Sequence, residues 1–348
     1  MTIRRTFLKL AAASAIAGLT SSVHAQEPIP VVTTFSILGD MVERVGGDAV
    51  LVTTLVGRNG DTHVYQPTPA DAKAVKRATL MFTNGLEFEG WLERLAEAAE
   101  FDGLTVVTTD GLELIALEEH HDDDHDEHNE HAKADTEEHH DEAGEDHHEE
   151  DEHSDEEHND HDEDGHHDHG EFDPHGWLSL RNAIVYVDNI TAALAKAAPA
   201  SAATFYQNRA NYIAEIERLD LEIKMLIAAL PEAARTIVTS HDAFQYFGRD
   251  YGLSFLAPQG LSTESEASAR DVAELIKQVR REEISAVFVE NVADPRLLRQ
   301  IARETGSAIG GKLYPGALSE QDGPAATYLD LMRHNATTIT KALTEAKR

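Results

Sequence analysis

Residues 118–171 contain too little apolar surface to fold into a packed core. The segment holds fifteen histidines, twenty-eight Asp or Glu residues and one basic side chain, Lys133, so almost nothing in it offsets the entropy cost of ordering the chain. Imidazoles interleaved with carboxylates are the ligand types that borderline divalent metals prefer, zinc foremost. The alternative is an acidic linker that only keeps the protein soluble. We predict a disordered insert that collects metal at low affinity through His120, His121, His125, His128, His131, His139, His140, His147, His148, His153, His158, His161, His166, His167 and His169.

The rest of the chain is only mildly acidic. The insert accounts for −27 of the formal net charge of −35, which leaves −8 for everything else. This remainder has no basic stripe, so neither nucleic acid nor an anionic membrane surface is an expected partner. The 348 residues, less the insert and a leader, are enough for two domains of ordinary size.

Residues 1–25 have the pattern of an export signal. Arg4 and Arg5 precede the short apolar run Leu8–Leu19, and Val23-His24-Ala25 provides a small-x-small cleavage site. The run is too short to span a bilayer, and both the twin-arginine and the general secretory routes are open. The chain has no cysteine, which excludes disulfides, thiolate metal sites and a lipid-modified N-terminal cysteine. We therefore expect a soluble periplasmic protein whose metal ligands are nitrogen and oxygen.

Short apolar, β-branched runs alternate with helical patterns, which predicts α/β units with parallel sheets. Two amphipathic helices are predicted at 181–196 and 202–230, and the second could extend ~43 Å. The predicted strands are Ile29–Thr34, Val50–Leu55, Leu80–Thr83 and Leu104–Thr108 before the insert, and Thr236–Thr239, Ser254–Leu256, Ala286–Val289 and Ala308–Leu313 after it.

The predicted fold is α/β, with two lobes that are each a mostly parallel β-sheet flanked by helices, joined by a long helix. Which of the two helices joins the lobes is left open by the pattern. The predicted domains are the signal peptide at 1–25, a first lobe at 26–117 and 172–200 interrupted by the insert at 118–171, a helix at 201–230 as candidate connector, and a second lobe at 231–348.

Five histidines lie outside the insert. His24 leaves with the signal, and His334 in a helical stretch is expected to be a structural or surface residue. His63 and His241 follow predicted strands, one in each lobe, and His175 comes just after the insert. In open α/β sheets, ligand sites gather beyond the carboxyl ends of strands. Three imidazoles converging there would form an incomplete tetrahedral zinc site with one open position.

The chain resembles the substrate-binding proteins of zinc and manganese ABC importers, the cluster with a rigid helix between the lobes. The resemblance covers nearly everything after the signal and implies that His63, His175 and His241 are the metal ligands. Manganese-type members have glutamate at the position of His241, and zinc-type members carry a His/Asp-rich loop where this insert lies. The resemblance rests on Gly60-Asp61-Thr62-His63-Val64-Tyr65-Gln66-Pro67-Thr68-Pro69, Asn84-Gly85-Leu86-Glu87-Phe88-Glu89-Gly90-Trp91, Asp173-Pro174-His175-Gly176-Trp177-Leu178, Ser240-His241-Asp242-Ala243-Phe244-Gln245-Tyr246-Phe247 and Gly323-Pro324-Ala325-Ala326-Thr327-Tyr328-Leu329-Asp330.

The chain departs from the family at Gly316. Many members place an aspartate ligand there, and glycine has no side chain to offer. The fourth ligand could be water, a carboxylate such as Asp322 or Glu290, or an imidazole from the insert. We favour water or a nearby carboxylate.

The hypothesis from the sequence is zinc capture without catalysis. Imidazole ligands suit Zn²⁺ better than Mn²⁺, and the resemblance implies delivery to an ABC permease. We expect a monomer, and the insert could act as a collector, as a sensor of zinc sufficiency or as a docking site for a periplasmic zinc chaperone. Two alternatives are a zinc hydrolase, since three histidines and a water also form a catalytic site, and a periplasmic zinc buffer without a transporter. No HExxH-type motif supports the hydrolase.

Overall fold

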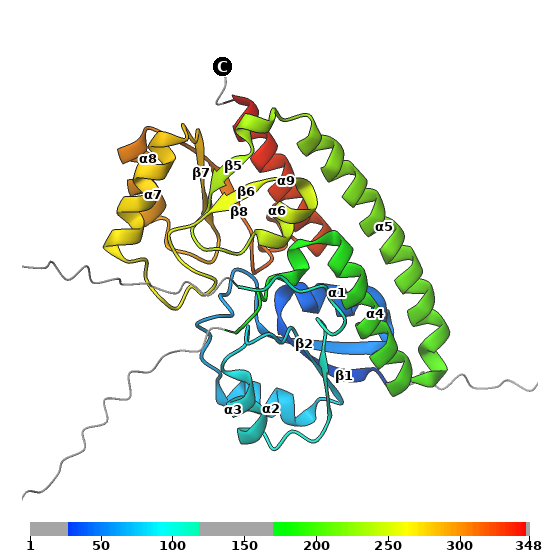
Figure 1. The fold of residues 1–348 in the computed structure, drawn as a ribbon. Coiled ribbons are helices and arrows are strands. Elements are labelled where there is room, and N and C mark those ends of the chain that lie inside the picture. Colours follow the sequence, from blue (N-terminus) through cyan, green and yellow to red (C-terminus); the bar gives the residue numbers. More distant parts are fainter. Residues whose placement is uncertain (1–26, 118–169, 346–348) are drawn as a thin grey trace, which may run out of the picture.

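The first of two parallel β-sheets is built from the chain before the insert (Figure 1). In this computed structural model, residues 27–117 and 170–345 are described; the predicted signal peptide and all fifteen insert histidines lie outside them. The strand order is β2-β1-β3-β4. The central strands are almost wholly buried, whereas half-buried and exposed residues alternate along most of the edge strand β2, as expected where only one side of a strand is covered. The strands are β1 (Ile29–Phe35), β2 (Val50–Val56), β3 (Leu80–Thr83) and β4 (Leu104–Val107).

The second sheet repeats this arrangement. Its order is β6-β5-β7-β8, again with every pair parallel. Its strands are β5 (Thr236–Val238), β6 (Ser254–Leu256), β7 (Ala286–Glu290) and β8 (Ala308–Leu313). All eight predicted strands are confirmed. In both sheets the first strand of the lobe lies between the second and the third, so each sheet has its switch point beside β1 or β5. The sequence shows no convincing repeat, and the shared topology is visible only in the pairing.

Helices flank both sheets, and two of their boundaries carry recognisable sequence signals. Thr68 caps α2 in a capping box with Asp71, and Pro69 is its first residue. Helix α8 ends at Gly306, whose φ of 78° is left-handed and favours glycine. The helices are α1 (Ser36–Gly46), α2 (Pro69–Arg77), α3 (Leu92–Ala98), α4 (Leu180–Ala197), α5 (Ala202–Ala228), α6 (Gln245–Tyr251), α7 (Ala269–Arg281), α8 (Arg296–Thr305) and α9 (Tyr328–Glu345), with short 3₁₀ turns η1 (Gly47–Ala49), η2 (Gly176–Leu178), η3 (Pro199–Ser201) and η4 (Glu232–Ala234).

Helix α5 joins the two lobes. Its 27 residues correspond to about 40 Å, and it runs along one side of the molecule past both sheets (Figure 1). It packs against α1 and α4 of the first lobe and against α6 and α9 of the second. The predicted long linking helix is therefore confirmed, and the structure identifies it as the second of the two candidates. The domain boundary at residue 200 stays a prediction.

One apolar core extends through both lobes. It includes residues of β1 and β3, the buried stripe of α5, and residues of α6 and α9. A smaller, separate cluster lies under α7 and α8 at the outer side of the second lobe. Because the large core is shared, the lobes are held as one body except for this outer layer. Among the described residues, no helix is both long and apolar enough to cross a membrane.

Candidate metal centre

His63 lies in the loop after β2, and side chains of the first lobe hold this loop. The Trp91 Nε1–H donates to the carbonyl oxygen of Thr62 at 2.8 Å. The backbone N–H of His63 donates to Asp61 Oδ1 at 3.0 Å. The His63 side chain is half-buried, and its ring packs edge-on against Phe88 with 4.8 Å between centroids.

His175 directly precedes η2 and is fully buried. Asp173 Oδ1 accepts hydrogen bonds from its backbone N–H at 2.9 Å and from its Nδ1 at 2.8 Å. The ring therefore has Nε2 left over, and this atom is buried with no hydrogen-bond partner among the described residues. A buried polar atom without a partner is costly, and a metal ion would satisfy it.

His241 follows β5 and is also buried, at 1% exposure. Its Nδ1 lies 2.5 Å from Glu290 Oε2, at the end of β7. The other carboxylate oxygen, Glu290 Oε1, accepts from the backbone N–H of Ser240 at 2.9 Å and of His241 at 3.3 Å. Two carboxylates thus fix the rings of His175 and His241 in the same way, through Nδ1, and leave Nε2 of each ring available.

The three histidines converge on one point between the lobes. One ring nitrogen from each lies within 4.8 Å of the other two. Nitrogens at the corners of a triangle with this edge lie about 2.8 Å from its centre (4.8 Å divided by √3), whereas zinc binds imidazole at about 2.0–2.1 Å. Each ring therefore needs to move inward by less than about 1 Å to bind an ion.

The electrostatics favour neutral rings at two of the three positions. Burial lowers the pKa of His63 and of His175 well below the usual value, and the neighbouring histidines lower it further. Burial also acts to lower the pKa of His241, but the charge of Glu290 and its hydrogen bond outweigh burial and raise the pKa. Burial raises the pKa of Asp173 to about 7. His241 is thus the ring at which protons compete most strongly with a metal.

The proposed fourth ligands are placed differently. Glu290 is engaged with His241 and the adjacent backbone. Asp322 is exposed, and neither carboxylate joins the three-histidine group. A Cβ added at Gly316 would meet nothing within 4 Å. His334 lies on α9, half-buried, with Nε2 2.9 Å from the carbonyl oxygen of Lys312, and is outside the group.

A strained loop carries Phe88, the aromatic residue that packs against His63. Gly85, Leu86 and Glu87 are all left-handed, with φ of 83°, 55° and 59°, an unfavourable conformation for the two non-glycine residues. The buried carboxylate of Glu89 holds the loop by accepting from the Thr34 hydroxyl at 2.6 Å and the backbone N–H of Gly85 at 3.1 Å. In the sequence this segment is recognisable only as part of the family motif. The supporting role of Glu89 is not apparent from the sequence, because it depends on the burial of its carboxylate.

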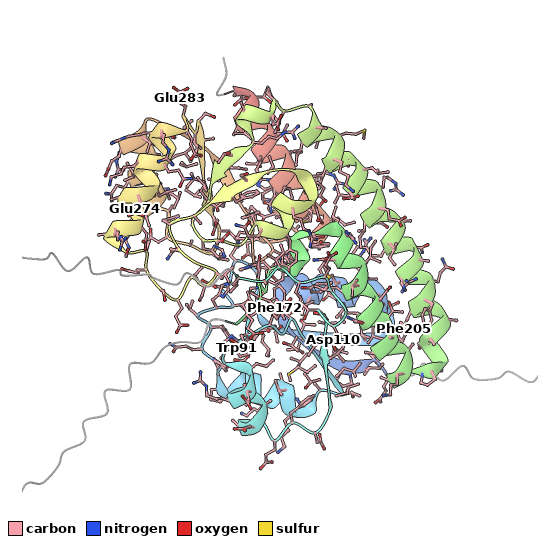
Figure 2. The ribbon with its side chains drawn as sticks, in the orientation of Figure 1. Trp91, Asp110, Phe172, Phe205, Glu274 and Glu283 are labelled. Atoms are coloured by element: carbon pink, nitrogen blue, oxygen red, sulfur yellow. The ribbon has the colours of Figure 1, made fainter. Side chains whose placement is uncertain are left out.

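A cleft of about 860 Å³ opens beside His63. Residues 64–66 and Trp91 of the first lobe line it, as do Leu261, Ser262 and Glu264 of the second. Trp91 and Phe172, another lining residue, are labelled in Figure 2 at the junction of the two lobes. Leu117 N–H donates to the carbonyl oxygen of Glu171 at 3.0 Å, so the two ends of the insert meet, and Gly170 lines this cleft.

The chain was compared with known proteins. Residues 31–342 match the family described as zinc-uptake complex component A, periplasmic (ZnuA). The manganese-binding lipoprotein MntA of Bacillus subtilis is 33% identical over 327 residues, covering 92% of this chain and 91% of the relative. The periplasmic zinc binding protein TroA of Treponema pallidum superposes with a TM-score of 0.74 at 26% identity, covering 91% and 99% of the two chains. A manganese-bound periplasmic metal binding protein of Candidatus Liberibacter asiaticus has a TM-score of 0.70 at 30% identity, covering 90% and 98%.

Proposed function

Since this chain belongs to the family of periplasmic zinc-uptake component A proteins, we propose that it captures Zn²⁺ between its lobes through His63, His175 and His241. The chain is an extracytoplasmic metal-binding substrate-binding protein of an ABC transporter. Its partner is accordingly the membrane part of that transporter. The proposal concerns which metal is bound and which residues bind it.

One observation carries the proposal: the approach of three imidazole nitrogens to within 4.8 Å of one another in a buried setting. The rings come from segments more than 60 residues apart in the sequence. Two of them are oriented by carboxylates through Nδ1, which is the usual outer shell of a zinc-binding histidine.

The choice of zinc over manganese rests on the donor atoms. The names of the relatives differ in metal, two with manganese and one with zinc. The group found here has three nitrogens and no carboxylate, whereas manganese prefers oxygen ligands. Water as the fourth ligand agrees with the engagement of Glu290 and the exposure of Asp322.

The test uses alanine variants of the three histidines in a chain without the insert. Replacing residues 118–170 by Asn-Gly is compatible with the structure, because Ala116 and Phe172 already pair as an antiparallel bridge. Competitive titration with zinc and manganese should show one tight zinc site. Each substitution should weaken it by more than about 100-fold, beyond the 10–100-fold cost of losing an outer-shell partner. Binding that survives all three substitutions would contradict the proposal.

Comparing the intact chain with the insert-deleted chain tests the collector role. The insert ends beside the cleft, so zinc held there at low affinity would raise the local concentration near His63. Cells with the deleted chain should grow more slowly when zinc is scarce, although the purified protein still binds one equivalent. Equal growth would exclude the collector role. Screening the zinc form for hydratase, esterase and phosphatase activity tests the hydrolase alternative, which robust turnover would support.

A further inference from the structure

His63 is held differently from the other two histidines. Within residues 27–117 and 170–345, neither ring nitrogen of His63 has a hydrogen-bond partner, whereas His175 and His241 each have a carboxylate on Nδ1. The polar link of His63 is its backbone N–H, which donates to Asp61 Oδ1. The position of the His63 ring therefore depends on Asp61, together with the Trp91 bond to Thr62 and the packing against Phe88.

Asp61 is in turn bound to the opposite lobe. The hydroxyl of Thr263 donates to Asp61 Oδ2 at 2.5 Å. Thr263 lies in the connection of residues 257–268, between β6 and α7. The two oxygens of one carboxylate thus join the loop of His63 to a loop of the second lobe.

The 257–268 connection also contacts the segment of His241. Gln259 pairs with His241 in an isolated parallel bridge, and the N–H of Asp242 donates to the carbonyl oxygen of Gly260 at 3.0 Å. A few residues further on, the same connection reaches Asp61 through Thr263. One short segment therefore spans from the His241 side of the site to the His63 side.

The Asp61–Thr263 hydrogen bond joins residues that adjoin the two walls of the cleft. His63 and residues 64–66 line one wall, and Leu261, Ser262 and Glu264 line the other. At the base of the His63 loop, separate bonds tie it to the second lobe: Arg58 donates to the carbonyl oxygens of Ser319 at 2.6 Å and Ala326 at 2.8 Å. Breaking the bond at the tip would thus remove this link between the His63 end of the loop and the second lobe without releasing the base, and the Trp91 bond to Thr62 would still tie this end to the first lobe.

The connection leads into α7, which packs in the smaller apolar cluster rather than in the large core. This outer layer is the part of the second lobe least tied to the first. Small movements of α7 would reach Thr263 before they reach His175, which is buried in the first lobe.

We infer that the hydrogen bond between Asp61 and Thr263 is a latch that sets how fast metal leaves the site. This inference rests on the proposed function. Asp61 is a positioning residue and not a ligand: with the latch closed, its carboxylate keeps His63 within reach of the metal. With the latch open, His63 withdraws towards the cleft and the metal, held by two imidazoles, escapes.

The test compares Thr263→Val, which keeps the shape but lacks the hydroxyl, with Thr263→Ser, which keeps the hydroxyl. The full mature chain is loaded with one equivalent of zinc, and release to excess chelator is followed in a stopped-flow instrument, where the slow phase reports the three-histidine site. Thr263→Val should speed this phase at least about tenfold, the size expected for losing a hydrogen bond to a charged group. Thr263→Ser should stay within about twofold, and so should the association rate of both variants. Ser265→Ala, at an exposed position on the same loop, is the matched control.

A double-mutant cycle keeps the test decisive if one variant folds poorly. Asp61→Ala removes the latch from the other side, so adding Thr263→Val to it should change release by less than about twofold. Additive effects, equal release from the Val and Ser variants, or unchanged release from Thr263→Val would each overturn the latch. Failure of the proposed function would look different: the slow phase would be missing from the wild-type chain or would persist in His175→Ala.

Discussion

Replacing Glu290 by glutamine should weaken zinc binding in a way that depends on pH. In the wild-type protein one oxygen of Glu290 lies 2.5 Å from His241 Nδ1, and the other accepts two backbone N–H groups. Glutamine keeps the shape but has one acceptor oxygen, so its NH₂ group must face a donor or turn away. Loss of such an outer-shell partner costs 10–100-fold in metal affinity, or about 1.4–2.7 kcal/mol. We expect this loss to be largest at pH 8, where protons compete least with zinc for the rings.

At lower pH the difference should shrink. Glu290 raises the pKa of His241, so in the wild-type protein a proton competes with zinc below that raised pKa, and each further pH unit costs about tenfold in affinity. Without the charge, burial should bring the pKa of His241 below its usual value, as it does for His63 and His175. The affinity of the variant should then fall less between pH 8 and pH 6 than that of the wild-type protein.

Isothermal titration with a competing chelator between pH 6 and pH 8, in the insert-deleted background, measures both effects. The ratio of the wild-type zinc affinity to that of the Glu290→Gln variant should fall steadily as the pH falls. A ratio that stays constant over the whole range would refute the argument, because the role assigned to the Glu290 charge requires it to vary. Equal affinity at pH 8 would show that the carboxylate does not orient His241.

Three further outcomes are expected. Gly316→Asp should raise manganese affinity relative to zinc in competitive titrations, because it adds an oxygen donor where a side chain meets no neighbour within 4 Å; Gly316→Ala is its control, and an equal change in both variants would contradict the reasoning. Asp40→Asn should stabilise the protein at pH 8 and have no effect below about pH 4. Burial raises the pKa of Asp40 from 3.8 to about 6, so the folded state takes up a proton before the unfolded state does, and the charged form costs about 2–3 kcal/mol at high pH. Urea unfolding at both pH values measures this effect, with exposed Asp48→Asn as the control, and a stabilisation that does not change with pH would count against it. Trp91→Phe should weaken zinc binding by about 2–10-fold, through loss of the 2.8 Å bond to the Thr62 carbonyl; a measured affinity equal to wild type would show that this bond does not position His63.

Much of the fold could be predicted from the sequence, because its signals are local. Apolar β-branched runs predicted all eight strands, and Thr68 and Gly306 are local signals at two helix boundaries. The sequence did not reveal which strands pair. Nor did it reveal that the first N–H of α9, at Tyr328, donates to Asp40 on α1, a contact between segments almost 300 residues apart.

The candidate site was predictable in its location but not in its supports. Histidines at the ends of strands in both lobes were expected to converge, since parallel strands of a sheet end at the same edge. The structure brings them together, and their role as ligands stays a prediction. Glu290 shows what was missed. The sequence offered it as a fourth ligand, but whether a carboxylate reaches the metal or the far nitrogen of a histidine depends on packing between β5 and β7.

The apolar interior common to both lobes means that neither half of this molecule is a free-standing module. Cutting the chain near residue 200 would remove the α5 side chains that cover α1 and α4. The two fragments would then expose large apolar surfaces. Transplanting one lobe from a relative would fail for the same reason unless α5 and its neighbours were carried along. Substitutions are therefore expected to be tolerated mainly in surface loops and the insert. Exchanging a lobe between relatives is expected to prevent folding.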